Sequence, residues 1–431
     1  MLSAVRLVVH PRGVVAALAL AALLLAGCDD GPPTPSASRS TPRPTATPRP
    51  PSDRDLLTRL VAARARALAD GDARAYVATA IGAQARRDRR ALAAARRLPL
   101  SRAELAARSV KVDGDRATLR VQLTYAFRGI DTHYLKSARL TARRTPDGWR
   151  IASDKPAAGT LAPWEHRAYT ARRSTHFLAL TPRGLKAPGL MADLERGYAK
   201  LRLPGVRPPR RVLVIVARDG ADVRALTKDI DTDALTAVAE TQFATRGRGQ
   251  SVSSLWGERV FVLWDSYRSR PADRRQTVIA HELTHAALAK RTSARTPPWL
   301  YEGIAMYASG DNRSGDAGAL LSGRGVLRVA SAETAARRAM SLARLSSPLA
   351  LQRLPTAGLA FAYAYSSAAA YTIAERYGPR ALLRVLRAYG SDALTGSGRA
   401  LTDKVLRRTL HVSLTRFQSQ VDAYATAHSR F

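Results

Sequence analysis

The segment His281-Glu282-Leu283-Thr284-His285 carries residue types that could form a metal-dependent hydrolytic site. Residues four apart lie on one face of an α-helix, so the imidazoles of His281 and His285 can share one ion. Glu282 lies one step round the helix, too far off that line to be an equivalent ligand. Its carboxylate can instead reach a water held by the ion. The spacing therefore predicts two ligands and a general base on one helix.

Two helices are expected to position these groups. Residues 276–289 contain neither glycine nor proline and have helical apolar spacing, and Pro271-Ala272-Asp273 is typical of a first turn. Downstream, Pro297-Pro298 begins a second helix with Glu302 in its first turns. A hydrolytic zinc site takes three protein ligands, and two histidines with a glutamate are a standard set, which makes Glu302 the predicted third ligand. Ligand type favours Zn²⁺, although spacing alone does not distinguish it from cobalt or manganese.

Two motifs together resemble those of the gluzincin metallopeptidases. They are the segment at residues 281–285 and Trp299-Leu300-Tyr301-Glu302-Gly303-Ile304-Ala305. Within this group the sequence is most similar to peptidase MA-like proteins, over residues 165–390. The resemblance implies a zinc endopeptidase acting on a protein or peptide substrate, with Glu282 as the general base. A metal site that has lost catalysis is the alternative.

Two tyrosines are candidates for stabilising the oxyanion of the tetrahedral intermediate. In the family, a tyrosine or histidine of a later helix often has this role. Residues 360–371 resemble that helix, with Tyr363 at the matching position and Tyr365 two residues later. The family more often has glutamine where Tyr365 stands. Core packing with one solvated edge is the alternative interpretation of both side chains.

Strands are predicted ahead of the active-site helix. Residues 211–216 form an apolar run before a helix that starts at Ala221, and residues 258–264 form a second run. The second run is interpreted as the edge of the sheet over the cleft, where an extended peptide would bind as an added strand. Residues 174–180 and 191–201 resemble the family's opening strand and helix. The chain after Ser331 is expected to be nearly all helical.

Residues 54–160 predict an accessory domain of helices followed by an antiparallel sheet. Helical spacing, broken at Gly71-Asp72, continues to about residue 97, and alternation begins after Val110 with a hairpin turn at residues 111–115. This order and the closing Asp-Gly-Trp-Arg-Ile strand resemble the nuclear transport factor two-like fold, whose cone can hold a small ligand or act as a spacer. No convergent polar cluster is visible in the sequence, so a passive domain is expected. The chain is therefore predicted to be α+β, with the metallopeptidase domain over residues 165–431.

The N-terminus predicts export and membrane attachment. Arg6 and Arg12 precede an apolar run at residues 14–25, which is shorter than the roughly 20 residues that span a bilayer. Leu25-Ala26-Gly27-Cys28 resembles the lipobox of bacterial lipoproteins. The resemblance implies removal of residues 1–27, lipidation of Cys28 and anchoring at the extracytoplasmic face of the cell membrane. Residues 28–53, rich in Pro, Ser and Thr, predict a disordered spacer.

Composition limits the remaining classes of function. The 431 residues are 46% hydrophobic and include one cysteine, which excludes an intramolecular disulfide and a zinc site of several thiolates. The net charge of +35 is spread through both domains without aromatic interleaving, so no nucleic-acid partner is expected. Anionic cell-wall polymer or lipid headgroups suit this charge better. The alternative to an enzyme is therefore a non-catalytic lipoprotein that binds cell-wall polymer or a partner protein. The oligomeric state is not predicted.

Overall fold

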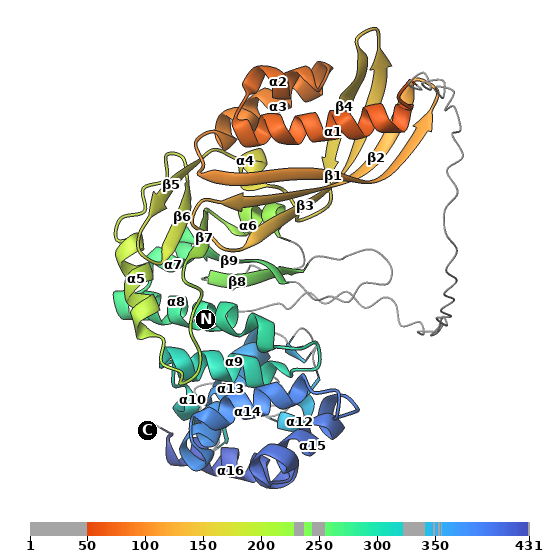
Figure 1. The fold of residues 1–431 in the computed structure, drawn as a ribbon. Coiled ribbons are helices and arrows are strands. Elements are labelled where there is room, and N and C mark those ends of the chain that lie inside the picture. The colour runs from red at the N-terminus through yellow and green to blue at the C-terminus, as the bar shows by residue number, and fades with distance from the viewer. Residues whose placement is uncertain are drawn as a thin grey trace, which may run out of the picture.

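The computed structural model describes residues 50–227, 237–243, 255–321, 341–347, 350–351, 354 and 356–429. Its fold is α+β, as predicted: an N-terminal helix-and-sheet layer, a mixed sheet and a helical C-terminal part follow one another along the molecule (Figure 1). Cys28, the predicted signal and nearly all of the predicted spacer lie outside the described residues. Within the described ranges, no helix has both the length and the apolar character needed to cross a bilayer.

The N-terminal layer has the predicted order of helices and strands. Its elements are α1 (Asp53–Asp70), α2 (Ala73–Ala78), α3 (Gly82–Ala95), β1 (Leu100–Asp113), β2 (Arg116–Phe127), β3 (His133–Thr145) and β4 (Gly148–Pro156), with the four strands antiparallel in sequence order. A capping box at Ser52 begins α1, and Gly71 ends it in the left-handed conformation, with φ 68°. The predicted hairpin turn joins β1 and β2 through Gly114, which has φ 57°.

The first strand begins well before the point, after Val110, at which alternation predicts it. β1 starts at Leu100, and most of its side chains are exposed or half-buried. An edge strand of this kind lacks the apolar alternation by which a half-buried strand is recognised. In the interior of this layer, Leu57 and Val61 of α1 pack on Leu119, Leu140 and Ile151 of the sheet.

The mixed sheet has the strand order β5-β6-β7-β9-β8. Short helix α4 (Pro163–His166) leads into β5 (Tyr169–Arg173) and β6 (Phe177–Pro182), which are followed by α5 (Leu190–Lys200), β7 (Val212–Ala217), α6 (Gly220–Leu226), β8 (Ala237–Phe243) and β9 (Leu255–Leu263). Strands β6, β7 and β9 are parallel, and β5 and β8 are antiparallel strands at the two edges.

The prediction that residues 258–264 form the sheet edge over the cleft is wrong. This run belongs to β9, which lies between β7 and β8, so the edge strand is β8. The physical reason is visible in the run itself, because Val260, Phe261 and Val262 are all buried. A strand buried on both faces reads as a continuous apolar run and belongs inside a sheet.

The mixed sheet is the middle layer of the molecule, with a different neighbour on each face (Figure 1). One face carries Phe177, Ala179 and Val214 and is covered by α5 and α8. The opposite face carries Leu178, Leu213 and Phe261 and packs on aromatic residues of β2 and β3. The core therefore continues across residue 160, from the N-terminal sheet into the mixed sheet.

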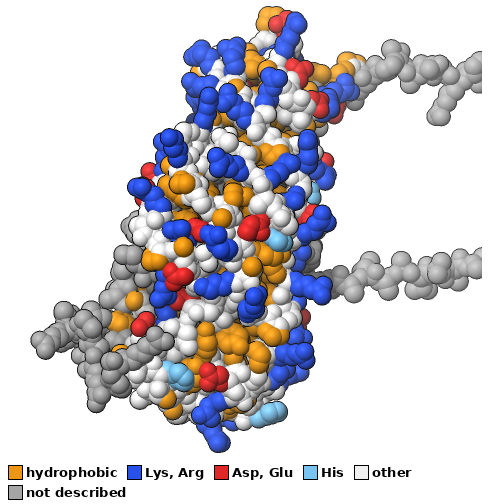
Figure 2. All heavy atoms as spheres, turned by 90° about the vertical axis from the view of Figure 1, so that its left-hand side faces the viewer, with side chains coloured by type: hydrophobic (Ala, Val, Ile, Leu, Met, Phe, Trp, Pro, Cys, Tyr) orange, Lys and Arg blue, Asp and Glu red, His pale blue; other side chains and the backbone are white. Residues whose placement is uncertain are grey.

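The remainder of the described chain is helical, as predicted for the part after Ser331. The helices are α7 (Trp264–Arg268), α8 (Ala272–Leu288), a 3₁₀ turn (Ala289–Arg291), α9 (Pro298–Ser309), α10 (Ser314–Leu321), α12 (Leu342–Leu345), α13 (Thr356–Tyr377), α14 (Arg380–Tyr389), α15 (Gly398–Leu410) and α16 (Leu414–Ala427). Helix α13 packs against α9, α10, α14 and α16 and is the centre of this part. On the face shown in Figure 2, Lys and Arg side chains are spread from one end of the molecule to the other and form no single stripe.

Candidate metal centre

Helices α8 and α9 bring together His281, His285 and Glu302, the three predicted ligands. The two Nε2 atoms of the histidines lie 3.0 Å apart, and Glu302 Oε2 lies 3.2 Å from that of His281 and 3.5 Å from that of His285. Ligand atoms about 2.0–2.2 Å from a tetrahedral Zn²⁺ are about 3.3–3.6 Å from one another. The observed separations of 3.0, 3.2 and 3.5 Å are equal to this or a few tenths of an ångström shorter, so a small outward movement of the side chains would let them share a single ion. In the described part of the chain, no other group of three or more His, Cys, Asp or Glu could hold a metal ion.

The local sequence explains this convergence. Helix α8 lies on the sheet through Ile279 and Leu283, which leaves His281 and His285 on a different side of the helix. Pro298 begins α9 at its first position, where the missing N–H has no helical partner to lose. Glu302, one turn later, then faces the two imidazoles and is fully buried.

The electrostatics of the triad make Glu302 an anion. Burial raises the pKa of its carboxyl, but the neighbouring imidazoles of His285 and His281 have the greater effect and lower the pKa to about 2. Both imidazoles are themselves buried, and their Nε2 atoms point at one carboxylate oxygen. A neutral imidazole nitrogen and an ionised carboxylate oxygen are both donors of electron pairs, so this set suits a divalent cation.

Glu282, the predicted general base, is fully buried beside the triad. It is one of the negative groups that raise the pKa of Tyr363, together with Glu302. The carboxylate of Glu282 and that of Glu302 therefore both lie within electrostatic range of the same phenol. Glu282 is thus a second buried carboxylate, adjacent in sequence to the predicted ligand His281.

Tyr363 packs on Met306 of α9, one turn after Glu302, whereas Tyr365 faces α16. Tyr363 is 2% exposed, and its hydroxyl has no hydrogen-bond partner within the described chain. Burial and the nearby carboxylates raise its pKa well above the ordinary value, so the phenol stays neutral and can donate. The hydroxyl of Tyr365 instead donates to Asp422 of α16, at 2.6 Å. A role for either tyrosine in catalysis stays a prediction, and the geometry favours Tyr363.

Sequence reasoning missed Arg313, which lies in the loop after α9. Its backbone N–H donates to Ser367 Oγ, one turn beyond Tyr363 on α13, and its guanidinium binds Asp311 at 2.7 Å. The positive charge of Arg313 lowers the pKa of Tyr363, against the effect of the carboxylates. Arg313 belongs to neither motif, and no spacing rule connects residue 313 with residue 363.

The comparisons with known proteins add no relative. No protein-family model, curated protein or solved structure matches the chain. What links it to the gluzincins is therefore the HExxH segment, the downstream glutamate and the buried triad that they form, which is consistent with a gluzincin-like site.

Proposed function

We propose that this chain is a membrane-anchored, zinc-dependent endopeptidase. The observation that carries the proposal is the convergence of His281, His285 and Glu302, with ligand atoms within 4.8 Å of one another and a second buried carboxylate, Glu282, beside them. Zn²⁺ held by these three residues would supply a Lewis acid and lower the pKa of water to about 7.

The protein residues around the ion can perform the proton transfers of peptide hydrolysis. Glu282 accepts the proton of the attacking water and passes it to the departing amine, so one carboxylate serves both steps. The neutral phenol of Tyr363 donates a hydrogen bond to the oxyanion that develops on the peptide carbonyl. The mechanism thus uses two buried side chains from α8 and α13 in addition to the three ligands.

The edge strand β8 supports binding of an extended peptide. Within the described chain β8 pairs with β9 alone, and it packs beside α8, the helix of the two histidines (Figure 1). A peptide that pairs with the other edge of β8 would gain affinity from backbone hydrogen bonds and little sequence selectivity. The expected substrate is therefore an unstructured protein segment.

The isosteric change Glu282→Gln tests the proposed chemistry. Removal of a general base costs about 10²–10⁴-fold in rate, so we expect turnover of a casein-type substrate to fall by that factor while the variant still binds one zinc. The control is Glu104→Gln, a change of the same type on the exposed strand β1, which should leave turnover unaltered. Undiminished turnover by zinc-loaded Glu282→Gln would refute the base assignment. Absence of any turnover by the zinc-loaded wild type would refute the endopeptidase.

The anchor is tested separately from the chemistry. We propose that Cys28 is lipidated and holds the chain at the extracytoplasmic face of the membrane, as its lipobox-like sequence indicates. Cys28→Ser should move the protein from the membrane fraction to the soluble fraction and abolish incorporation of a labelled fatty acid. An unchanged membrane fraction in this variant would exclude lipid anchoring through Cys28.

The excess of positive charge favours a second candidate, a non-catalytic lipoprotein that binds anionic cell-wall polymer. The formal net charge is +35, and basic side chains are spread over the face shown in Figure 2. Charge-driven adhesion weakens as salt is raised, because counterions screen it. Salt-sensitive binding of isolated wall material by Glu282→Gln, combined with no peptide cleavage by the wild type, would favour this candidate over the enzyme.

A further inference from the structure

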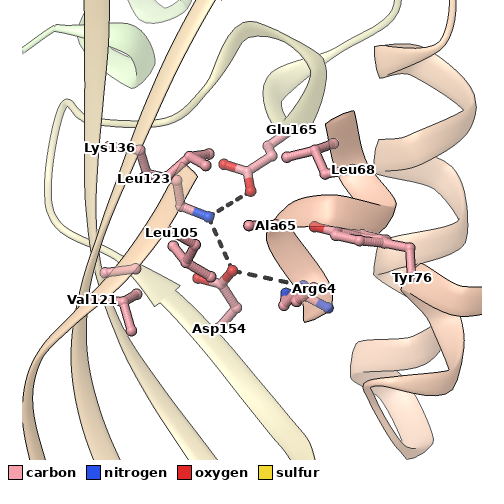
Figure 3. Close-up of a pocket in the computed structure, with 11 residues that line it drawn as sticks. Arg64, Ala65, Leu68, Tyr76, Leu105, Val121, Leu123, Lys136, Asp154 and Glu165 are labelled. Atoms are coloured by element: carbon pink, nitrogen blue, oxygen red, sulfur yellow. Dashed lines mark hydrogen bonds and ion pairs between the residues drawn. The ribbon is translucent and has the colours of Figure 1, made fainter. Parts of the chain in front are cut away.

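A half-open cavity lies in the N-terminal layer, between α3, α4 and the end of β4. Its volume is about 500 Å³, within the range of small-molecule sites. Lys136, Asp154 and Glu165 form its floor, and the same three side chains also line a smaller inner void of about 20 Å³. Figure 3 shows Lys136 between the two carboxylates, with Arg64 of α1 beyond Asp154.

The floor is a buried cluster of acidic and basic side chains. Lys136 Nζ lies 3.0 Å from Asp154 Oδ2 and also binds Glu165, while Arg64 binds Asp88 through two hydrogen bonds of 2.6 and 2.7 Å. Burial and the charge of Asp154 raise the pKa of Glu165, although Lys136 opposes the shift, so the charge of this cluster is close to balanced. Because a buried charge is stable only when it is paired and hydrogen-bonded, Asp154 favours a further hydrogen-bond donor.

One carboxylate oxygen in the floor lacks a donor. Asp154 is nine-tenths buried, and its Oδ1 has no hydrogen-bond partner within the described chain. A buried acceptor left unsatisfied costs about 1–3 kcal/mol, and more when it is charged. A water in the inner void could supply one donor, since about 10–15 Å³ is enough for it. The ammonium group of a ligand at the floor could supply the same donor.

The rim of the cavity has the opposite character. Arg87 and Arg90 project from α3 at its mouth, both are exposed, and neither has an acidic partner among the described residues. Between rim and floor, Leu161, Ala91 and the indole of Trp164 give the wall an apolar stretch. The cavity therefore has the acidic residues Asp154 and Glu165 at the bottom, an apolar side and guanidinium groups at the top.

We propose that this cavity binds a small zwitterion, a free amino acid with an apolar side chain. The ammonium group faces Asp154, the carboxylate faces Arg87 and Arg90, and the side chain lies along Leu161 and Trp164. The proposal is independent of the metal centre and of any peptidase activity. The expectation of a passive N-terminal domain depended on the absence of a convergent polar cluster, and Lys136, Asp154 and Glu165 form such a cluster.

Calorimetric titration of the full chain with L-leucine tests the proposal. The protein is first dialysed against a chelator, so that the amino acid cannot bind through a metal. Two probes that each lack one charge are compared with leucine: 4-methylpentanoate has no ammonium group, and isopentylamine has no carboxylate. We expect saturable one-to-one binding of leucine and at least tenfold weaker binding of each probe. No saturable binding of leucine, or equal binding of either probe, would overturn the proposal.

A matched pair of variants locates the binding. Arg87→Gln/Arg90→Gln removes the rim charges, and Arg86→Gln/Arg89→Gln makes the same change to exposed arginines of α3 that do not line the cavity. Because all four side chains are exposed, both variants should fold as the wild type does. We expect Arg87→Gln/Arg90→Gln to bind leucine at least tenfold more weakly than the wild type does. Arg86→Gln/Arg89→Gln should bind leucine with the affinity of the wild type. Equal affinity in the two variants would exclude the cavity as the site.

The floor is tested by Asp154→Asn, which keeps the size of the side chain and removes its charge. We expect this variant to lose its preference for leucine over 4-methylpentanoate, because the carboxylate that faces the ammonium group is gone. A preference that is retained in a folded Asp154→Asn protein would show that Asp154 does not bind the ammonium group. Thermal unfolding without ligand establishes that the variant is folded, and the rim variants test the site if it is not.

Discussion

Gly303 of α9 lies directly against the backbone of Ser366 on α13. A Cβ at Gly303 would be 2.3 Å from the carbonyl oxygen of Ser366 and 3.0 Å from the Cβ of Ala370. The two helices can approach this closely only because residue 303 has no side chain. Gly303 directly follows the ligand Glu302, and Ser366 is one turn after Tyr363, so this contact sets the distance between the proposed ligand and the proposed oxyanion donor.

Gly303→Ala should therefore separate α9 from α13 and disturb the metal centre. The added methyl group has to displace backbone atoms, and overpacking of this kind costs about 1–3 kcal/mol. We expect a lower free energy of unfolding in urea together with weaker zinc binding. Gly184→Ala is the control, because nothing lies within 4 Å of its Cβ and only the positive φ of 83° opposes it. A zinc affinity unchanged from wild type in Gly303→Ala would contradict this account.

Tyr363→Phe and Tyr365→Phe should have opposite consequences. Loss of the Tyr363 hydroxyl removes an oxyanion donor, so kcat should fall about 10²–10³-fold with little change in KM or zinc content. Loss of the Tyr365 hydroxyl removes its hydrogen bond to Asp422, so the protein should lose about 1–3 kcal/mol of stability and keep its kcat. Steady-state kinetics and urea unfolding of both variants separate the two roles. A larger kcat effect at Tyr365 would reverse the assignment.

Zinc should stabilise the fold through the triad. Binding to the folded chain alone adds about 2.7 kcal/mol at a free zinc concentration of a hundred times Kd, and a chelator should remove this increment. In His285→Ala the ion loses one of its three ligands, so added zinc should no longer raise Tm. His176→Ala is the matched control, since His176 binds Glu195 and is not in the triad. The same zinc-dependent rise in both variants would exclude His285 as a ligand.

The proposed ligands could be predicted from the sequence because their relation is mostly local. His281 and His285 share a helix face by their spacing alone, and Pro297-Pro298 marks where the next helix begins. The choice between Tyr363 and Tyr365 could not be made in this way. It depends on how α13 turns toward α9 or α16, and that is decided by tertiary contacts such as Gly303 with Ser366.

The strands of the mixed sheet could likewise be predicted where their own sequence identifies them, and not where only tertiary contacts do. Apolar runs in β7 and β9 identified strands buried on both faces, whereas β8, Ala-Val-Ala-Glu-Thr-Gln-Phe, has no such run and was not predicted. The buried ion cluster was also invisible, because Arg64, Lys136 and Asp154 are far apart in the chain. An arginine in a helix and a lysine in a strand each look like ordinary surface residues until the fold pairs them.

Arg64→Met should be strongly destabilising. The guanidinium of Arg64 and the carboxylate of Asp88 are both 3% exposed, so removal of the cation leaves a buried anion with less compensation. Breaking one partner of a buried pair costs about 3–5 kcal/mol, which urea unfolding can measure. The double variant Arg64→Met/Asp88→Leu should recover most of this loss. A single variant that loses less than about 1 kcal/mol would show that the pair is dispensable.

Glu258→Gln should stabilise the protein, and increasingly so as the pH rises. Burial raises the pKa of Glu258 in β9 from its ordinary 4.5 to about 7, although the charge of Lys290 opposes the shift. The folded state therefore holds this proton more tightly than the unfolded state does. The tighter proton binding contributes about 3 kcal/mol to the free energy of unfolding. This contribution is fully present below pH 4.5 and is lost as the pH rises through 7.

The difference in the free energy of unfolding between Glu258→Gln and wild type isolates the contribution of the Glu258 carboxyl, because all other titrating groups are common to both proteins. Urea unfolding at a series of pH values should show that the advantage of the variant grows between pH 5 and pH 8 and is constant above that range. Glu104→Gln, on exposed strand β1, should show no such growth. An advantage that stays constant from pH 5 to pH 8 would mean that the Glu258 carboxyl titrates alike in the folded and unfolded chains, and that burial does not hold its proton.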